Sequence, residues 1–178
     1  MARKTSLREF QQNVAQRLRD LSSRKTVASK LGFQVGPDYW LVTLADVSEV
    51  IPVPAFVPVP RTLPWFRGVS NIRGKLYSVV DFAHFQGEQV IGPGMERRVI
   101  LIHERLLEGS ALLVTRMLGL RNPENFTADT SAAEKRPWES ARFRDSTGVV
   151  WRELDLAKLA VEPRFLEVGA DSISTVAS

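Results

Sequence analysis

From position 31 onward, the chain consists of short apolar runs separated by turn residues. Two of these runs, 31–35 and 39–44, flank Gly36-Pro37-Asp38, which predicts a hairpin with a three-residue turn. Further strands are predicted at 76–82, 98–103, 111–118, 142–143 and 149–153. Many short strands with little helix are typical of a closed antiparallel β architecture. Two small barrels fit a body of this length better than one large sheet does.

The segments between these runs have distinct compositions. Residues 52–64 contain five prolines, which excludes a helix or a central strand and predicts an extended edge or a loop. Residues 46–51 fit either a short helix or a strand, and 122–137 are polar and loop-like. Asp155 is placed to cap a short C-terminal helix. The tail 167–178 is small and polar, and is predicted to be flexible.

The first 29 residues follow a different period. Five apolar residues are spaced three and four apart and form one narrow stripe on a helix, with Gln, Arg and Asn on the other face: Leu7, Phe10, Val14, Leu18 and Leu21. This pattern favours an amphipathic helix that packs on its own body or on a partner. A transit peptide and a membrane-surface helix are the alternatives. Both are less favoured, because the apolar stripe is thin and lacks Trp. The chain has no apolar run for a secretory signal or a spanning helix.

Charge separates the same two parts. The 178 residues carry a formal net charge of +4 and have a pI of about 9.8, which suggests nucleic acid or an anionic membrane as a partner. Residues 1–30 hold eight basic and two acidic groups, whereas the other 148 hold 16 basic and 18 acidic groups. The basicity therefore belongs to the arm 1–29, and the body 30–166 has no basic stripe interleaved with aromatics.

The residues needed for catalysis or metal binding are scarce. The chain has no cysteine, which excludes disulfides, thiolate metal sites and thiol nucleophiles. Its two histidines, His84 and His103, lie 19 positions apart, and neither has a neighbour at metal-ligand spacing. Gly68-Val69-Ser70-Asn71 fails the G-x-S-x-G nucleophile motif at its last position. We therefore expect a protein without catalytic, metal-binding or cofactor-binding residues.

One segment, 65–82, stands out from the rest. Gly68 and Gly74 bracket a tight stretch where the backbone needs a positive φ or a close approach. Arg73 lies between apolar Ile72 and Gly74, next to a buried-looking strand, so it needs an anionic partner. Glu49 is the natural candidate, because it is the lone acid in an apolar stretch.

From Phe33 to Gly87 the chain resembles the CheW-like domain of bacterial chemotaxis. The matching residues are Phe33, Gly36, Tyr39, Val47, Glu49, Val50, Ile51, Leu63, Pro64, Gly68, Val69, Asn71, Arg73, Gly74, Val79, Val80, Asp81 and Gly87. Departures are Ser78, where the family often has proline, and Val114-Thr115-Arg116, where it commonly has "vVD". The arm and Trp65-Phe66-Arg67 look most like the branch that serves type IV pilus twitching motility.

The resemblance implies a fold and a function. CheW-like domains are mainly β, with two five-stranded SH3-like barrels. They are cytoplasmic, non-enzymatic adaptors in membrane-associated or polar complexes, and they bind a chemoreceptor's cytoplasmic tip and a CheA-type histidine kinase. No cofactor, nucleic acid or stable membrane insertion is implied. The alternative function is a small β-barrel module that binds nucleic acid through its basic arm.

The resemblance also implies the site residues. In the family, the counterparts of Glu49 and Arg73 pair with each other near the receptor-binding surface, and Val47, Gly68 and Gly74 are their neighbours. Two roles are open for the pair: it contacts the partner, or it only sets the geometry of the loop. If the pair is deeply buried, loss of one partner costs ~3–5 kcal/mol.

Overall fold

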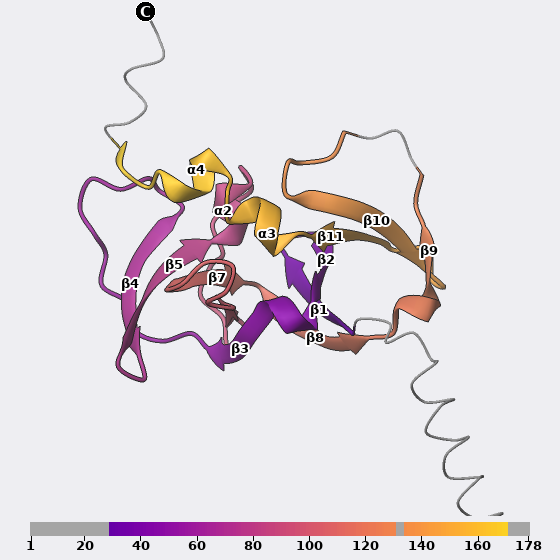
Figure 1. Cartoon of the computed structure of the whole chain (residues 1–178), viewed down its shortest axis with the longest axis horizontal. Helices are drawn as coiled ribbons and strands as arrows, with labels where there is room; N and C mark the ends of the chain where they lie inside the picture. The colour runs from indigo at the N-terminus through magenta and orange to yellow at the C-terminus, as the bar shows by residue number, and fades with distance from the viewer. Residues whose placement is uncertain (1–28, 131–133, 171–178) are drawn as a thin grey trace, which may run out of the picture.

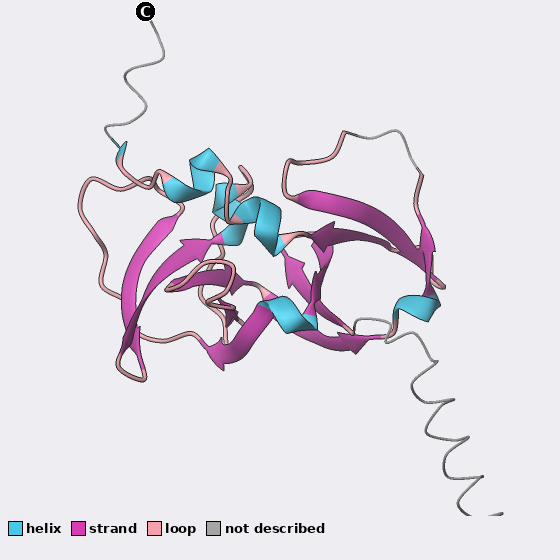
Figure 2. Ribbon diagram, in the orientation of Figure 1, coloured by secondary structure: helices cyan, strands magenta, loops and turns pink. Residues whose placement is uncertain are grey.

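The structure is a computed structural model that describes residues 29–130 and 134–170. Two curved β-sheets lie side by side, and a few short helices cover one side of their junction (Figures 1 and 2). The chain is therefore mainly β, as predicted. The amphipathic helix predicted within 1–29 and residues 171–178 of the predicted tail lie outside the described residues.

The first sheet has six strands in the order β8-β1-β2-β11-β10-β9. Its strands are β1 Lys30–Val35, β2 Asp38–Thr43, β8 Arg116–Arg121, β9 Phe126–Ala128, β10 Glu139–Asp145 and β11 Val150–Leu154. Only β11 and β2 pair in parallel. The sheet has one strand more than the resemblance implied, and β9 lies in a segment that was expected to be loop. Gly36 and Pro37 alone form the turn between β1 and β2, because Asp38 already pairs with Val35, so the three-residue turn was wrong.

The second sheet has the five strands that the resemblance implied, in the order β3-β6-β7-β5-β4. They are β3 Val47–Pro52, β4 Phe66–Ile72, β5 Lys75–Asp81, β6 Arg98–Ile102 and β7 Ser110–Val114. The ambiguous segment 46–51 is therefore almost entirely strand, and it follows the short 3-10 helix η1, Leu44–Asp46. Among the described residues, no strand pairing closes either sheet into a ring.

The single strand predicted at 111–118 is two strands that belong to different sheets. Thr115 lies between them and contacts the first sheet: its backbone N–H donates to the Gln34 carbonyl at 3.0 Å, and its Oγ1 accepts from the Gly36 N–H at 3.0 Å. Only Thr115 and Arg116 interrupt the apolar residues here, and no Gly or Pro separates β7 from the start of β8. The spacing of apolar residues alone does not show that the chain passes from one sheet to the other here.

The apolar core joins the two sheets. Aromatic rings fill much of it, and Phe85 lies at the centre, with ring centroids 5.2 Å from Trp65, 4.8 Å from Trp138 and 5.3 Å from Phe165. Phe85 belongs to the short helix α2, Phe82–Phe85, and Phe165 to α4, Pro163–Leu166, whereas Trp65 and Trp138 directly precede β4 and β10. A third short helix, α3 Leu156–Leu159, follows β11. As predicted, Asp155 caps α3, and its carboxylate accepts from the Lys158 N–H at 3.0 Å.

A polar network connects the two sheets at their junction. The Arg136 guanidinium reaches Asp38 of β2 and, beyond α2, Glu88, each at 3.4 Å. Nearby, the buried carboxylate of Glu139 pairs with Arg142 and Arg152. Burial raises the pKa of Glu139, but the hydrogen bond from Arg142 and the charge of Arg152 outweigh burial and hold the pKa below its ordinary value. The junction is therefore packed and charge-compensated.

Candidate partner-binding site

The Glu49–Arg73 ion pair that the sequence suggested is present. The Arg73 Nη2 lies 2.7 Å from the Glu49 Oε1. Glu49 belongs to β3, and Arg73 lies in the turn between β4 and β5. Since β3 and β4 are the two outer strands of the second sheet, the ion pair connects opposite edges of one curved sheet.

This pair lies at the surface. The Arg73 side chain is 76% exposed and that of Glu49 is 34% exposed. The buried surroundings expected for Arg73 are therefore wrong: Ile72 is buried, but the turn projects beyond it into solvent. Surface ion pairs contribute only about 0–1 kcal/mol to stability, so the pair is a weak structural element. Its guanidinium remains accessible to another protein.

Arg73 has an unusual backbone conformation for a residue with a side chain. Its φ is 52° and that of Gly74 is 84°, the two positive values of a type I′ hairpin turn. The Asn71 Oδ1 accepts from the Gly74 N–H at 2.9 Å and holds the turn. Asn-Gly is the usual pair for this turn, and a bulkier side chain at positive φ costs about 1–2 kcal/mol. The turn therefore holds an arginine at a position where it destabilises the hairpin.

We expect Arg73→Asn to leave the free energy of unfolding equal to that of the wild type or to raise it by about 0.5–1 kcal/mol, because Asn tolerates positive φ and the lost ion pair is exposed. Urea denaturation measures the change. Arg73→Val is the matched control: it also removes the ion pair but adds a β-branched side chain, and should be destabilising. Equal losses in both variants would show that the ion pair, and not the turn geometry, dominates.

Gly68 has a different role from Gly74. Its φ is +125°, and a Cβ at this position would lie 2.1 Å from the Val57 carbonyl oxygen. Val57 and Val69 exchange two backbone hydrogen bonds of 2.7 and 2.9 Å, which fix the proline-rich segment along β4. The segment predicted as an extended edge or a loop therefore covers the outer side of β4. Gly68 permits this contact and is itself buried.

The five predicted residues do not form one surface. Glu49, Arg73 and Gly74 lie together and are reachable from solvent, whereas Gly68 is buried nearer the other end of β4. Val47 pairs with Ile102 in the β3–β6 ladder and packs against the core. Exposure thus separates the candidate contact residues from those that support the fold.

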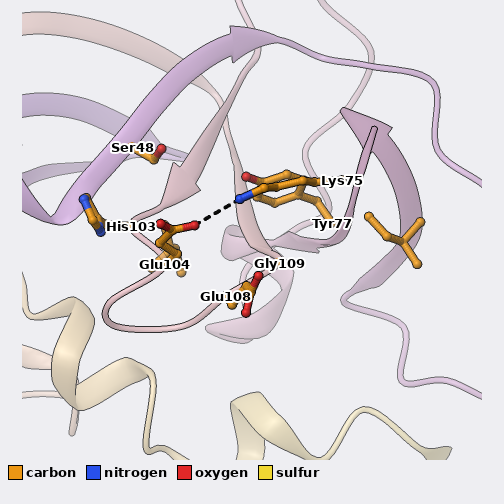
Figure 3. Close-up of a pocket in the computed structure, with 9 residues that line it drawn as sticks. Ser48, Lys75, Tyr77, His103, Glu104, Glu108 and Gly109 are labelled. Carbon is orange, nitrogen blue, oxygen red and sulfur yellow. Dashed lines mark hydrogen bonds and ion pairs between the residues drawn. The ribbon is translucent and has the colours of Figure 1, made fainter. Parts of the chain in front are cut away.

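A pocket is lined by residues that are next in sequence to Glu49 and to the Arg73-Gly74 turn, and Figure 3 shows it. It has a volume of about 290 Å³ and lies between β3, the start of β5 and the loop that joins β6 to β7. The residues that line it are Ser48, Lys75, Leu76, Tyr77, Ile102, His103, Glu104, Glu108 and Gly109. Ser48 precedes Glu49, and Lys75 follows Gly74, so residues of the pocket and of the ion pair are neighbours along β3 and along the β4–β5 turn. We call the pocket residues together with Glu49, Arg73 and Gly74 the hairpin face.

The hairpin face combines opposite charges with an exposed apolar side chain. The Lys75 Nζ lies 3.0 Å from the Glu104 Oε2, as the dashed line in Figure 3 shows. This hydrogen bond lowers the pKa of Glu104 and raises that of Lys75, so both are charged at neutral pH. Leu76 beside them is 64% exposed. Polar groups around an exposed apolar residue are typical of a surface that binds protein.

Neither histidine stands in a catalytic arrangement. His103 directly follows β6, and its Nδ1 accepts from the Arg105 N–H at 3.2 Å, so it stabilises a turn. Within 29–130 and 134–170, no three His, Asp or Glu side chains are grouped in a way that could hold a metal ion. In those same two ranges, no helix has the length and apolar character needed to cross a membrane.

The sequence interpretation missed most of the pocket. Leu76 was predicted to be a strand residue, like the buried Val79 and Val80. The apolar pattern of this strand does not show that its first residues are exposed. Glu104 and Glu108 lie in the loop between β6 and β7, and this loop reaches the start of β5 because β7 pairs with the distant strand β5. Nothing local in the sequence marks them.

Comparison with known proteins gives three consistent matches. The family model described as the CheW-like domain matches residues 30–164. Protein PilI of Pseudomonas aeruginosa is 30% identical over 125 residues, which are 70% of this chain and 68% of that protein. Among solved structures, the scaffolding protein TtCheW from Thermoanaerobacter tengcongensis has a similar fold, with a TM-score of 0.67 and 16% identity. That match covers 80% of this chain and 98% of TtCheW.

Proposed function

The chain belongs to the CheW-like domain family, and from this premise we propose that it couples a chemoreceptor to a CheA-type histidine kinase. The family consists of non-enzymatic scaffolds of chemosensory signalling, so the chain acts by contact and not by catalysis. An adaptor changes the activity of a kinase only through different affinities for the kinase's active and inactive states. The two partners, a receptor tip and a kinase regulatory domain, are part of the proposal.

The observation that carries the proposal is the accessible Glu49–Arg73 pair on the hairpin face. An exposed arginine in a strained turn contributes little to stability, which favours a role in contact. We propose that Arg73 and Glu49 contact the receptor. Gly74 would allow the turn, and Gly68 and Val47 would support the strands on either side.

The similarity to PilI supports a more specific assignment. We propose that the chain acts in a pathway that controls type IV pili, in the cytoplasm at membrane-associated or polar chemosensory complexes, and the 30% identity to PilI supports this proposal. Deletion of the gene is expected to abolish twitching zones in a host that carries type IV pili. Normal twitching, together with kinase capture by the protein, would retain the adaptor role and exclude the pilus assignment.

We expect Arg73→Ala to weaken receptor capture at least tenfold while shifting the free energy of unfolding by less than about 1 kcal/mol, because the lost ion pair is exposed. Pull-down with immobilised receptor tip and with a kinase regulatory fragment measures capture, and urea denaturation measures stability. Lys158→Ala is the matched control, since it breaks the exposed Lys158–Asp155 pair of α3, outside the hairpin face, and should leave capture unchanged.

Two results would contradict the contact role. A stable Arg73→Ala variant that captures receptor and kinase at wild-type affinity would remove it. A loss of capture that follows a loss of stability would assign the pair to loop geometry. The same samples test the nucleic-acid alternative: strong, salt-sensitive DNA binding without kinase capture would replace the adaptor proposal.

A further inference from the structure

A second, smaller cavity lies in the first sheet, away from the hairpin face. It has a volume of about 20 Å³ and is lined by Lys30, Leu41, Pro123, Phe126 and Phe143. We call these five residues the aromatic mouth. Four of them belong to strands: Lys30 and Phe126 begin β1 and β9, and Leu41 and Phe143 lie within β2 and β10. Pro123 belongs to η2, Pro123–Asn125, which lies near β9 at one end of the sheet (Figure 1).

The mouth is the open side of an aromatic cluster. Leu41 is buried and forms its floor, whereas Phe126 and Phe143 are only half-buried. These two rings are T-shaped with centroids 6.4 Å apart, and Phe126 also contacts Trp151 at 5.6 Å. A cavity of this size holds one small group, and a water there would need two or more polar partners. With apolar residues on four of its five lining positions, the mouth suits the tip of an apolar side chain.

The positive charge of Lys30, at the rim of the aromatic mouth, is already neutralised. The Lys30 ammonium pairs with Glu153 and donates a 2.9 Å hydrogen bond to the Thr43 hydroxyl. Lys30 therefore presents mainly its aliphatic stem to the cavity. An occupant that supplied a carboxylate to Lys30 would have to displace an existing ion pair, which again favours an apolar occupant.

Lys30 is also the point where the arm joins the body. Residue 29 is fixed there, because its carbonyl accepts from the Leu44 N–H at 3.0 Å. The apolar stripe of the arm ends at Leu21, so eight residues, 22–29, connect it to the mouth. Eight extended residues span at most about 26–29 Å, so the stripe reaches the mouth of its own chain without strain.

We propose that the arm docks on its own body, with the stripe of Leu7, Phe10, Val14, Leu18 and Leu21 lying against Phe126 and Phe143 and one apolar side chain entering the cavity. The occupant is thus a segment of the same chain. Intramolecular attachment raises its effective concentration, so a thin stripe and a small cavity are sufficient for occupancy. The basic face of the arm then points to solvent and stays available to acidic partners.

A spin label on the arm tests this proposal in the full chain. Because the native sequence has no cysteine, Gln16→Cys gives a single attachment site on the face opposite the stripe. We expect the label to cause loss of the NMR signals of Leu41, Phe126 and Phe143, while signals of the β4–β5 hairpin persist. Val14→Asp/Leu18→Asp in the stripe should restore the signals. Gln12→Asp/Asn13→Asp adds the same charge to the polar face and should not.

The other occupants have distinct outcomes, and each would overturn the proposal. Signal loss only when isotope-labelled chains are mixed with spin-labelled copies would identify a second copy as the occupant. Docking that appears only with anionic vesicles would make the arm a membrane anchor. Sharp mouth signals in every variant would mean that the arm does not dock. Body signals outside the mouth report the fold in each variant, so an unfolded sample cannot be mistaken for any of these results.

Discussion

Gly68→Ala is expected to lower the free energy of unfolding by about 3 kcal/mol or more. The new Cβ would lie 2.1 Å from the Val57 carbonyl oxygen and 2.6 Å from its carbonyl carbon, which are backbone atoms that cannot rotate away. Forced separation of packed groups costs about 1–3 kcal/mol, and a side chain at a φ of +125° adds about 1–3 kcal/mol. If the segment instead moves away, the two hydrogen bonds between Val57 and Val69 are lost.

Gly74→Ala is the matched control for this prediction. It makes the same chemical change in the same hairpin at a φ of +84°, but no atom lies within 4 Å of the new Cβ. We expect a loss of about 1–2 kcal/mol, from backbone conformation alone. Urea denaturation of both variants measures the difference. Equal losses would mean that the proline-rich segment yields freely and that its contact with β4 does not constrain the sheet.

The contrast between the two glycines bears on the proposed function. The segment 53–58 leaves the end of β3 and returns along β4, so it joins the same two sheet edges that the Glu49–Arg73 pair joins. Release of the segment would let β3 and β4 move apart and would shift Glu49 relative to Arg73. A Gly68 variant can therefore lose receptor capture without any change in the contact residues.

The sequence predicted those parts of the site that a local pattern of residues indicates. The lone glutamate of an apolar stretch and an arginine between Ile72 and Gly74 indicated an ion pair across 24 positions, and the distance between Glu49 and Arg73 confirms it. The exposure of Arg73 was not predictable, because it depends on how far the turn projects beyond buried Ile72. A residue at the tip of a hairpin is exposed even when its neighbours in the sequence are apolar.

The missed features share a second cause, which is pairing between distant segments. β4 carries Gly68, Ser70 and Asn71 among its apolar residues, so its alternation is weak, and it is a strand because β5 and the proline-rich segment pair with its two sides. The helix α2 has only four residues and follows β5 directly, without a polar break. Its start is set by the side chain of Asp81, whose role a single sequence does not reveal.

Asp81→Ala should lower the free energy of unfolding by about 2–4 kcal/mol. The Asp81 carboxylate is fully buried: one oxygen accepts from the His84 N–H at 3.1 Å and caps α2, and the other accepts from the Ile91 N–H at 3.0 Å. Loss of a helix cap costs about 1 kcal/mol, and a buried N–H left without an acceptor costs about 1–3 kcal/mol. The Arg67 guanidinium, 3.9 Å from the same carboxylate, would also lose its counter-charge.

Asp155→Ala is the matched control, because it removes a helix cap that is not buried. Asp155 caps α3 through an equivalent 3.0 Å hydrogen bond, but its side chain is 29% exposed and water can replace it. A loss of only about 1 kcal/mol is expected there. Hydrogen exchange of the Ile91 amide gives the second readout, since it should become faster in the Asp81 variant and stay unchanged in the Asp155 variant. If both variants lose the same free energy and the Ile91 amide stays protected, Asp81 acts only as a helix cap, and the segment after α2 is held by its apolar contacts alone.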